Sequence, residues 1–241
     1  MRRFAMICLP YLWLVALFLV PFLIVFKISL SDIDLAIPPY TPRLDFNAGW
    51  QGFLRFWAAL DFENYVFLTS DDLYWKAYLS SLRIAFISTT LTLLIGYPIA
   101  YGIARANTEW RATLLMLVIL PFWTSFLIRV YAWMGILGTE GLLNQLLLAL
   151  GLIETPLTIL NTNWAVYIGI VYTYLPFMIL PIYASLEKLD NSLLEAAIDL
   201  GCSRLRAFWL ITMPLSKNGV VAGCFLVFIP ALGEFVIPSL L

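Results

Sequence analysis

The sequence has 241 residues, of which 62% are hydrophobic and only 12% are charged, and its formal net charge is -1. This apolar share is well above that of a soluble domain, so it excludes an ordinary soluble protein and indicates an integral membrane protein. The three cysteines show no Cys-x-x-Cys spacing and the chain contains no histidine, which argues against a disulfide framework and against a metal site.

Five apolar segments are long enough to cross a bilayer, whose hydrocarbon core of about 30 Å requires about 20 residues of helix. They occupy residues 6–27, 80–104, 112–137, 164–186 and 218–241. The first is interpreted as a retained anchor helix within residues 1–27, because its apolar run exceeds that of a usual signal peptide and no cleavage site is clear. A cleaved signal peptide is the alternative. The pattern predicts an all-α integral membrane protein with five visible spans.

The connectors between these segments predict how the chain is oriented in the membrane. Residues 28–79 form a long, mixed connector that we expect to be an external loop with short amphipathic helices. The cations of the short connectors and the N-terminus are Arg2, Arg3, Arg105, Arg111, Lys188, Arg204, Arg206 and Lys217. By the positive-inside rule these stretches face the cytoplasm, and the N-terminus is cytoplasmic. Residues 138–163 contain no Lys or Arg and are expected outside.

The connector between the fourth and fifth spans has the pattern of two short helices. Ser192 is followed three residues later by Glu195, which is typical of a capping box at a helix N-terminus. Gly201 suits the end of that helix, Ser203 suits the start of a second one, and Pro214 marks the return towards the membrane. We expect a compact knob with small residues where another protein approaches closely.

This connector resembles the EAA loop of ABC importer permeases, E-A-A-x3-G-x9-I-x-L-P. The matching residues are Glu195, Ala196, Ala197, Gly201, Ile211 and Pro214, and Met213 replaces the usual leucine. The resemblance implies a type I ABC importer permease bundle with a transmembrane core at 80–241 and a sixth span expected beyond Leu241. It also implies that residues 187–217, here named the coupling loop, contact an ATPase subunit through Glu195, Ala196, Ala197 and Gly201.

Two further stretches, residues 119–133 and 233–238, look like the polyamine branch of these permeases, as does the segment at 37–41. This resemblance implies a permease for polyamines, with putrescine favoured, in a bacterial inner membrane. The implied partners are a second and different permease, two cytoplasmic ATPase subunits, an external solute-binding protein and membrane lipid, without nucleic acid. No Gly-x4-Gly-Lys-Ser/Thr occurs, so we expect ATP and Mg on the ATPase subunits and no cofactor on this chain.

Two charged residues lie well away from the ends of the predicted spans, Glu234 in the fifth and Arg129 in the third. A charge near the bilayer centre costs roughly 2.5–3.5 kcal/mol, which favours positions facing the bundle. For a cationic diamine, Glu234 is the natural attractive group. Ring faces for the cation are expected from Trp123, Tyr131 and Trp133. The alternative is that Glu234 pairs with Arg129 or with a polar group of another subunit and that the rings only pack. Arg129 is interpreted as a structural or gating charge.

Three other functions remain as alternatives. The first is an ABC permease for another small solute, such as thiamine, iron or a phosphonate. The second is a secondary transporter or channel, against which the EAA loop argues. The third is a membrane-embedded enzyme, which lacks support because the chain has no histidine, no clustered carboxylates and no nucleophile paired with a base.

Overall fold

The computed structural model describes residues 8, 10–35, 37, 39–42 and 49–241. The chain is 78% helical, which confirms the predicted all-α fold. It divides into two compact units, residues 1–78 and 79–241. Arg2 and Arg3, on which the predicted orientation partly depends, lie outside the described residues.

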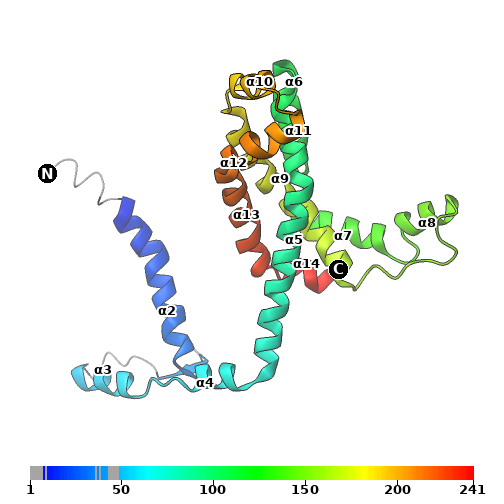
Figure 1. The fold of residues 1–241 in the computed structure, drawn as a ribbon. Coiled ribbons are helices and arrows are strands. Elements are labelled where there is room, and N and C mark those ends of the chain that lie inside the picture. Colours follow the sequence, from blue (N-terminus) through cyan, green and yellow to red (C-terminus); the bar gives the residue numbers. More distant parts are fainter. Residues whose placement is uncertain (1–7, 9, 36, 38, 43–48) are drawn as a thin grey trace. The chain divides into compact units, whose positions relative to one another are not determined.

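The first unit contains an apolar helix followed by a small loop structure with short helices and strands (Figure 1). Its elements are η1 (Val15–Leu19), α2 (Val20–Ser29), β1 (Asp32–Ile33), β2 (Tyr40–Thr41), α3 (Gly49–Ala58) and α4 (Glu63–Ser70), with β1 and β2 antiparallel. The Lys27 ammonium lies 3.7 Å from the centre of the Tyr40 ring. The Asn64 amide donates to the Ser29 and Ser31 carbonyls at 3.2 and 3.0 Å, so these contacts fix the loop to the end of α2.

The second unit contains most of α5 (Asp72–Arg105), a 34-residue helix, and every later element. These are α6 (Thr108–Ile119), η3 (Leu120–Trp123), α7 (Phe126–Leu137), α8 (Leu142–Ala149), α9 (Asn163–Glu187), α10 (Asn191–Asp199), α11 (Arg204–Ala207), η4 (Phe208–Thr212), α12 (Met213–Leu215), α13 (Lys217–Leu232) and α14 (Val236–Leu240). Residues of α5, α9 and α13 share one buried apolar cluster.

Small residues let α13 approach α9 closely. A Cβ added at Gly219 would lie 2.6 Å from the Pro181 carbonyl oxygen, and one at Gly223 would lie 2.9 Å from the Met178 sulfur. Gly219 and Gly223 are four residues apart and therefore occupy one face of α13. In a bilayer, where apolar side chains gain little by leaving lipid, such small-residue faces are a main source of helix association.

The predicted first, second and fourth spans each correspond to one long apolar helix, whereas the predicted third and fifth spans are broken and the third candidate span of the structure is Phe126–Ala149. In the described part of the chain, four helices are long and apolar enough to cross a membrane, or five if Arg204–Leu215 and Lys217–Leu232, bent by 63°, form one span. The predicted third span, 112–137, is interrupted after η3, where Thr124 is extended and its hydroxyl donates to the Pro121 carbonyl at 2.7 Å. The predicted fifth span, 218–241, is interrupted between α13 and α14.

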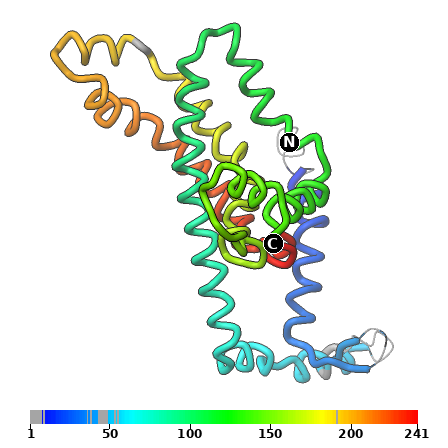
Figure 2. Tube along the Cα trace, turned by 90° about the vertical axis from the view of Figure 1, so that its right-hand side faces the viewer, coloured from blue at the N-terminus to red at the C-terminus, as the bar shows by residue number. Residues whose placement is uncertain are grey.

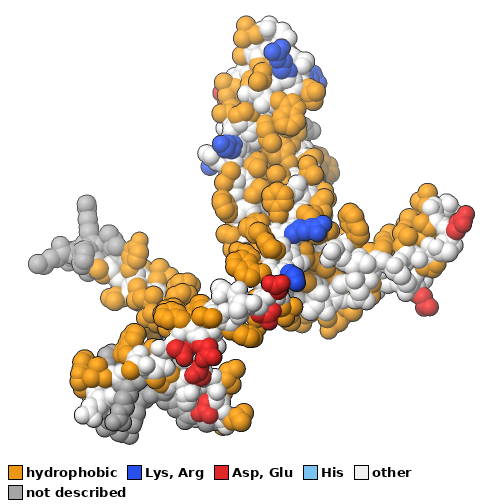
Figure 3. Space-filling view, turned by 60° about the horizontal axis from the view of Figure 1, so that its bottom comes forward, with side chains coloured by type: hydrophobic (Ala, Val, Ile, Leu, Met, Phe, Trp, Pro, Cys, Tyr) orange, Lys and Arg blue, Asp and Glu red, His pale blue; other side chains and the backbone are white. Residues whose placement is uncertain are grey.

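Six of the eight cationic side chains of the second unit belong to the coupling loop or to the turn between α5 and α6 and its flanks, and the other two are Arg83 and Arg129. Figure 3 shows Lys and Arg at the end formed by the coupling loop and the turn between α5 and α6, with acidic side chains at the tip of the arm formed by α8 and the following loop. Apolar side chains cover most of the surface between them. This distribution is the one that the positive-inside rule expects if the coupling loop faces the cytoplasm.

Candidate functional site

The first helix of the coupling loop, α10, is capped by Asp190. The Asp190 carboxylate accepts a hydrogen bond from the Ser192 backbone N–H at 2.9 Å. The predicted capping box with Ser192 as the cap is therefore wrong, because Asp190 lies two residues earlier and is an equally good N-cap. This bond holds the pKa of the exposed Asp190 carboxyl below its usual value, since it stabilises the charged form.

The end of α10 is as predicted. Gly201 has a φ of +84°, a left-handed conformation that favours glycine. Its N–H donates to the Ile198 carbonyl and the Cys202 N–H donates to the Ala197 carbonyl, each at 2.9 Å, which together form a Schellman motif. Ser203 then caps α11, and its hydroxyl accepts from the Arg206 N–H at 3.3 Å.

The coupling loop presents an exposed and largely apolar surface. Figure 2 shows it projecting from the end of the long helices. Glu195, Ala196 and Gly201 are exposed, Ala197 is partly buried, and Glu195 has no hydrogen bond or ion pair among the described residues. The exposed large apolar side chains around them are Leu193, Ile198, Leu200, Leu205, Trp209 and Leu210. Several exposed large apolar side chains on one short segment are typical of a protein interaction site.

Glu234 lies in the break between α13 and α14 and not within a helix. Its half-buried carboxylate accepts a hydrogen bond from the Tyr174 hydroxyl at 2.6 Å. The other oxygen accepts from the Val236 and Ile237 backbone N–H groups at 3.2 and 3.4 Å. Glu234 therefore caps the N-terminus of α14 and ties it to α9, because its side chain accepts hydrogen bonds from both helices.

A row of aromatic rings runs from Glu234 to Arg129. The Tyr174 ring lies 6.1 Å from Phe177, Phe177 lies 5.2 Å from Phe122, and the Arg129 guanidinium lies 5.2 Å from the Phe122 ring centre. Among the described residues, Arg129 forms no ion pair, and its buried Nε and Nη1 have no hydrogen-bond partner. The two charges that the sequence placed within the spans are thus connected through rings.

The three predicted aromatic residues do not form one cluster. Trp123 and Tyr131 are 75% and 58% exposed, and only Trp133 makes a ring contact within the described chain, edge-on to Tyr172 at 5.3 Å. Tyr174, whose phenol is the direct side-chain partner of Glu234, was not among the predicted site residues. Nothing in the local sequence distinguishes Tyr174 from the interfacial tyrosines that are common in membrane helices.

A groove of about 460 Å³ lies between α5 and α13, away from Glu234. Its lining is apolar apart from two threonines, and the lining residues are Phe86, Thr89, Thr90, Leu93, Val220, Val221, Cys224, Phe225 and Phe228. It offers no anionic group to replace the hydration of an ammonium ion, so it is unsuited to a cationic solute.

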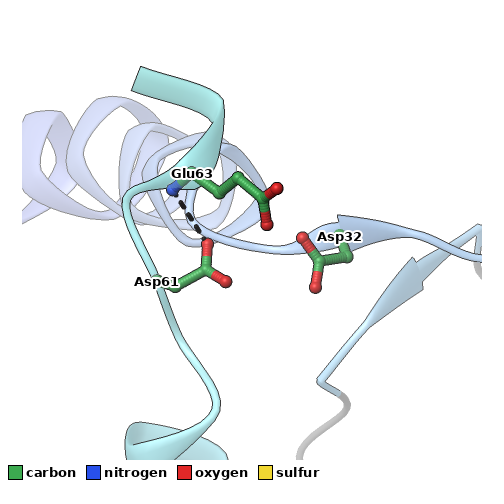
Figure 4. Close-up of side chains that lie close together, drawn as sticks. All are labelled: Asp32, Asp61 and Glu63. Atoms are coloured by element: carbon green, nitrogen blue, oxygen red, sulfur yellow. Dashed lines mark hydrogen bonds between the residues drawn. The ribbon is translucent and has the colours of Figure 1, made fainter. Parts of the chain in front are cut away.

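Three carboxylates come together in the first unit, which corrects the expectation of no clustered carboxylates. Oxygen atoms of Asp32, Asp61 and Glu63 lie within 4.8 Å of one another (Figure 4). The Glu63 backbone N–H donates to the Asp61 side chain at 3.1 Å, which accounts for part of this approach. Such oxygens suit hard cations, but exposed acidic groups of this kind are common without one, so we assign no ion here.

The comparisons with known proteins decide the family. The spermidine/putrescine transport system permease protein PotB of Haemophilus influenzae is 40% identical over 235 residues, which cover 98% of this chain and 76% of that protein. The chain belongs to the PotB family of transport permeases. PotB of Escherichia coli K12 is 49% identical to this chain over 179 residues, which cover 74% of this chain and 65% of that protein. No family model matches the chain.

Another relative and a solved structure agree with this assignment. The inner membrane ABC transporter permease protein YdcU of Escherichia coli K12 is 34% identical over 175 residues, covering 67% of this PotB-family chain and 56% of that protein. A bacterial ABC transporter that imports the acidic polysaccharide alginate has the same fold, with a TM-score of 0.62 at 18% identity over 95% of this chain and 73% of that one. The prediction of a multi-pass transport permease that is not an enzyme is confirmed.

Proposed function

We propose that the chain lines the translocation pathway of an ATP-driven polyamine importer in the bacterial inner membrane. The proposal is supported by relatives whose names specify spermidine and putrescine transport. The sequence favoured putrescine, and the relatives' names pair it with spermidine, so we propose both as cargo. The resemblance further implies that a second, different permease completes the pathway.

The single observation that carries the mechanism is the exposed knob of the coupling loop. Glu195 lies exposed on a short helix that is fixed at both ends, by Asp190 and by Gly201, and is surrounded by exposed apolar side chains. We propose that two cytoplasmic ATPase subunits, which hold ATP and Mg, bind this knob and its counterpart on the other permease. An external solute-binding protein delivers the cargo on the opposite side, and the N-terminus is cytoplasmic.

For the cargo, Glu234 supplies negative charge beside aromatic rings, the combination that attracts an ammonium group. A dication that enters a cell with an inside-negative potential gains about 4.6 kcal/mol per 100 mV, twice the single-charge value. The ATPase is therefore needed for direction, accumulation and gating, and not to drive an uphill entry step. We propose that Arg129, whose buried guanidinium nitrogens have no partner among the described residues, is a structural or gating charge.

The test is ATP-dependent uptake of radiolabelled putrescine and spermidine into proteoliposomes that contain the complete transporter. For the coupling loop, Glu195→Ala is compared with Asp199→Ala, an exposed acidic residue of the same helix. We expect Glu195→Ala to lower uptake about tenfold while ATP hydrolysis continues, since a hydrogen bond to a charged group contributes about 1.5–3 kcal/mol. The Asp199→Ala variant should transport normally.

For the cargo site, Glu234→Gln is compared with Tyr174→Phe. The substituted glutamine carries no charge but can still accept from the α14 amides, whereas Tyr174→Phe keeps the charge and removes one donor. If the charge attracts the cargo, uptake falls about tenfold in Glu234→Gln only. Equal losses in both variants would mean that Glu234 only holds α14 to α9. Absence of polyamine uptake by the wild-type complex would refute the proposed cargo.

A further inference from the structure

The coupling loop is joined to α5 by an aromatic contact. Phe208 begins η4, a π-helical turn, and its ring is edge-on to both Tyr97 and Tyr101, at 5.7 and 5.5 Å. These two tyrosines are four residues apart and therefore occupy one face of α5. Phe208 thus lies against two successive turns of a transmembrane helix. Single π-helical turns are rare and occur frequently at functional sites.

A second contact joins the same tyrosine to the start of α13. Ser216 lies at the 63° bend between the end of the coupling loop and α13, and it is fully buried. Its hydroxyl is 2.9 Å from the Tyr97 hydroxyl and can also donate to the Met213 carbonyl at 3.1 Å. Tyr97 is itself only 8% exposed. The ring of Tyr97 therefore contacts the loop before the bend, and its hydroxyl contacts the bend itself.

This joint is connected to the rest of the second unit. One turn beyond Ser216, Gly219 packs directly against the Pro181 carbonyl of α9. A displacement at the bend therefore reaches α9 through a contact with no room for compression. Because Tyr97 is buried, separating the two hydroxyls would leave the Tyr97 hydroxyl without its Ser216 partner, which favours joint movement of the two residues.

We propose that Tyr97 is the positioning residue that transmits a displacement of the coupling loop to the spans. Phe208 passes the displacement to α5 through the Tyr97 and Tyr101 rings, and Ser216 passes it to the base of α13 through the Tyr97 hydroxyl. The inference rests on the proposed function, because it requires an ATPase subunit that moves the coupling loop.

The experiment measures solute transported per ATP hydrolysed in proteoliposomes that contain the complete transporter. The variant Tyr97→Phe keeps the ring and removes only the hydroxyl, and Ser216 retains its bond to the Met213 carbonyl. The control is Tyr183→Phe in the same buried cluster, which also loses a phenol hydrogen bond, the 2.7 Å bond to Glu187 four residues away in α9. Although Glu187 is the first residue of the coupling loop, this bond lies within α9 and does not join α9 to another helix.

We expect Tyr97→Phe to lower the transport-to-ATPase ratio about fivefold, equivalent to about 1 kcal/mol, at unchanged complex yield. Tyr183→Phe should leave the ratio unchanged. In a double-mutant cycle with Ser216→Ala, the double variant should be no worse than the poorer single variant, because both remove the same contact. A normal ratio in Tyr97→Phe, an equal loss in Tyr183→Phe, or additive losses in the cycle would each overturn the proposal.

A second readout distinguishes failure of this proposal from failure of the proposed cargo. Hydrogen exchange at the cytoplasmic end of α5, residues 97–105, is compared with and without vanadate-trapped nucleotide, in the absence of any polyamine. The wild-type complex should show a nucleotide-dependent change that Tyr97→Phe loses and Tyr183→Phe keeps. If wild-type vesicles fail to take up polyamine while this pattern holds, the cargo is wrong and the joint stands. If the wild type shows no nucleotide-dependent change, the joint does not transmit.

Discussion

The tight approach of α13 to α9 at Gly219 predicts a large effect of one methyl group. In Gly219→Ala, the new Cβ would lie 2.6 Å from both the Pro181 carbonyl oxygen and the Ser185 Cβ. Ordinary contact begins at 3.4 Å, so α9 and α13 must separate locally by 0.8 Å. The Pro181 oxygen belongs to the backbone and cannot rotate away, which leaves movement of the whole helix as the response.

Overpacking of this kind costs roughly 1–3 kcal/mol, and the better helix propensity of alanine returns up to about 1 kcal/mol. Gly102→Ala in α5 is the matched control, because a Cβ at Gly102 meets nothing in the described chain within 4 Å. Since both variants gain the same propensity, the difference between them isolates the packing cost. For a unit of this size, a packing cost of about 2 kcal/mol should place the melting temperature of Gly219→Ala roughly 4–8 °C below that of Gly102→Ala.

The assay is thermal unfolding of the purified complete permease in detergent, followed by tryptophan fluorescence. Gly219→Ala should melt below the wild type, and Gly102→Ala should melt at or slightly above it. Equal melting temperatures for the two variants would refute the reasoning, because they would show that α9 and α13 do not meet at this glycine.

Three further predictions concern the connectors. Asn144→Ala should cost about 1–3 kcal/mol and speed proteolysis of residues 138–163, because the buried Asn144 amide exchanges hydrogen bonds with Leu157 at 2.9 Å in both directions. Gly201→Ala should cost about 1–2 kcal/mol from its backbone conformation alone, since an added Cβ meets no described atom within 4 Å, and hydrogen exchange in α10 reports it. Asp190→Ala should raise exchange in α10 at neutral pH. Because the native pKa of Asp190 is lowered, its cap acts fully above the unfolded pKa and is lost as pH falls through the native one, so the two proteins should converge in acid.

Most features set by local sequence were predicted, and the exception is the N-cap of α10, which is Asp190 and not Ser192. The predicted fourth span, 164–186, differs by one residue at each end from α9, Asn163–Glu187. The ends of the coupling-loop helices at Gly201 and Ser203 were also predicted, because a left-handed cap and a hydroxyl cap depend on one residue and its immediate neighbours.

Features set by distant partners were not predicted. The Tyr174–Glu234 bond joins residues 60 apart, and the Tyr97–Ser216 bond joins residues 119 apart. Hydrophobic periodicity shows which residues are apolar, but it does not show which face of one span meets another. The interruption of the third span was also missed. Prolines inside membrane helices are often tolerated, so a proline alone does not predict a break.

Helix α9 contacts both Glu234, in the break between α13 and α14, and the part of α13 that follows the coupling loop. Tyr174 holds Glu234, and Met178 and Pro181 lie against Gly223 and Gly219. Glu234 follows α13 after a single residue, so α13 cannot shift along α9 without changing the Tyr174–Glu234 bond. On the proposed function, a movement of α13 along α9 during transport would therefore also change the hydrogen bond that Tyr174 donates to the Glu234 carboxylate.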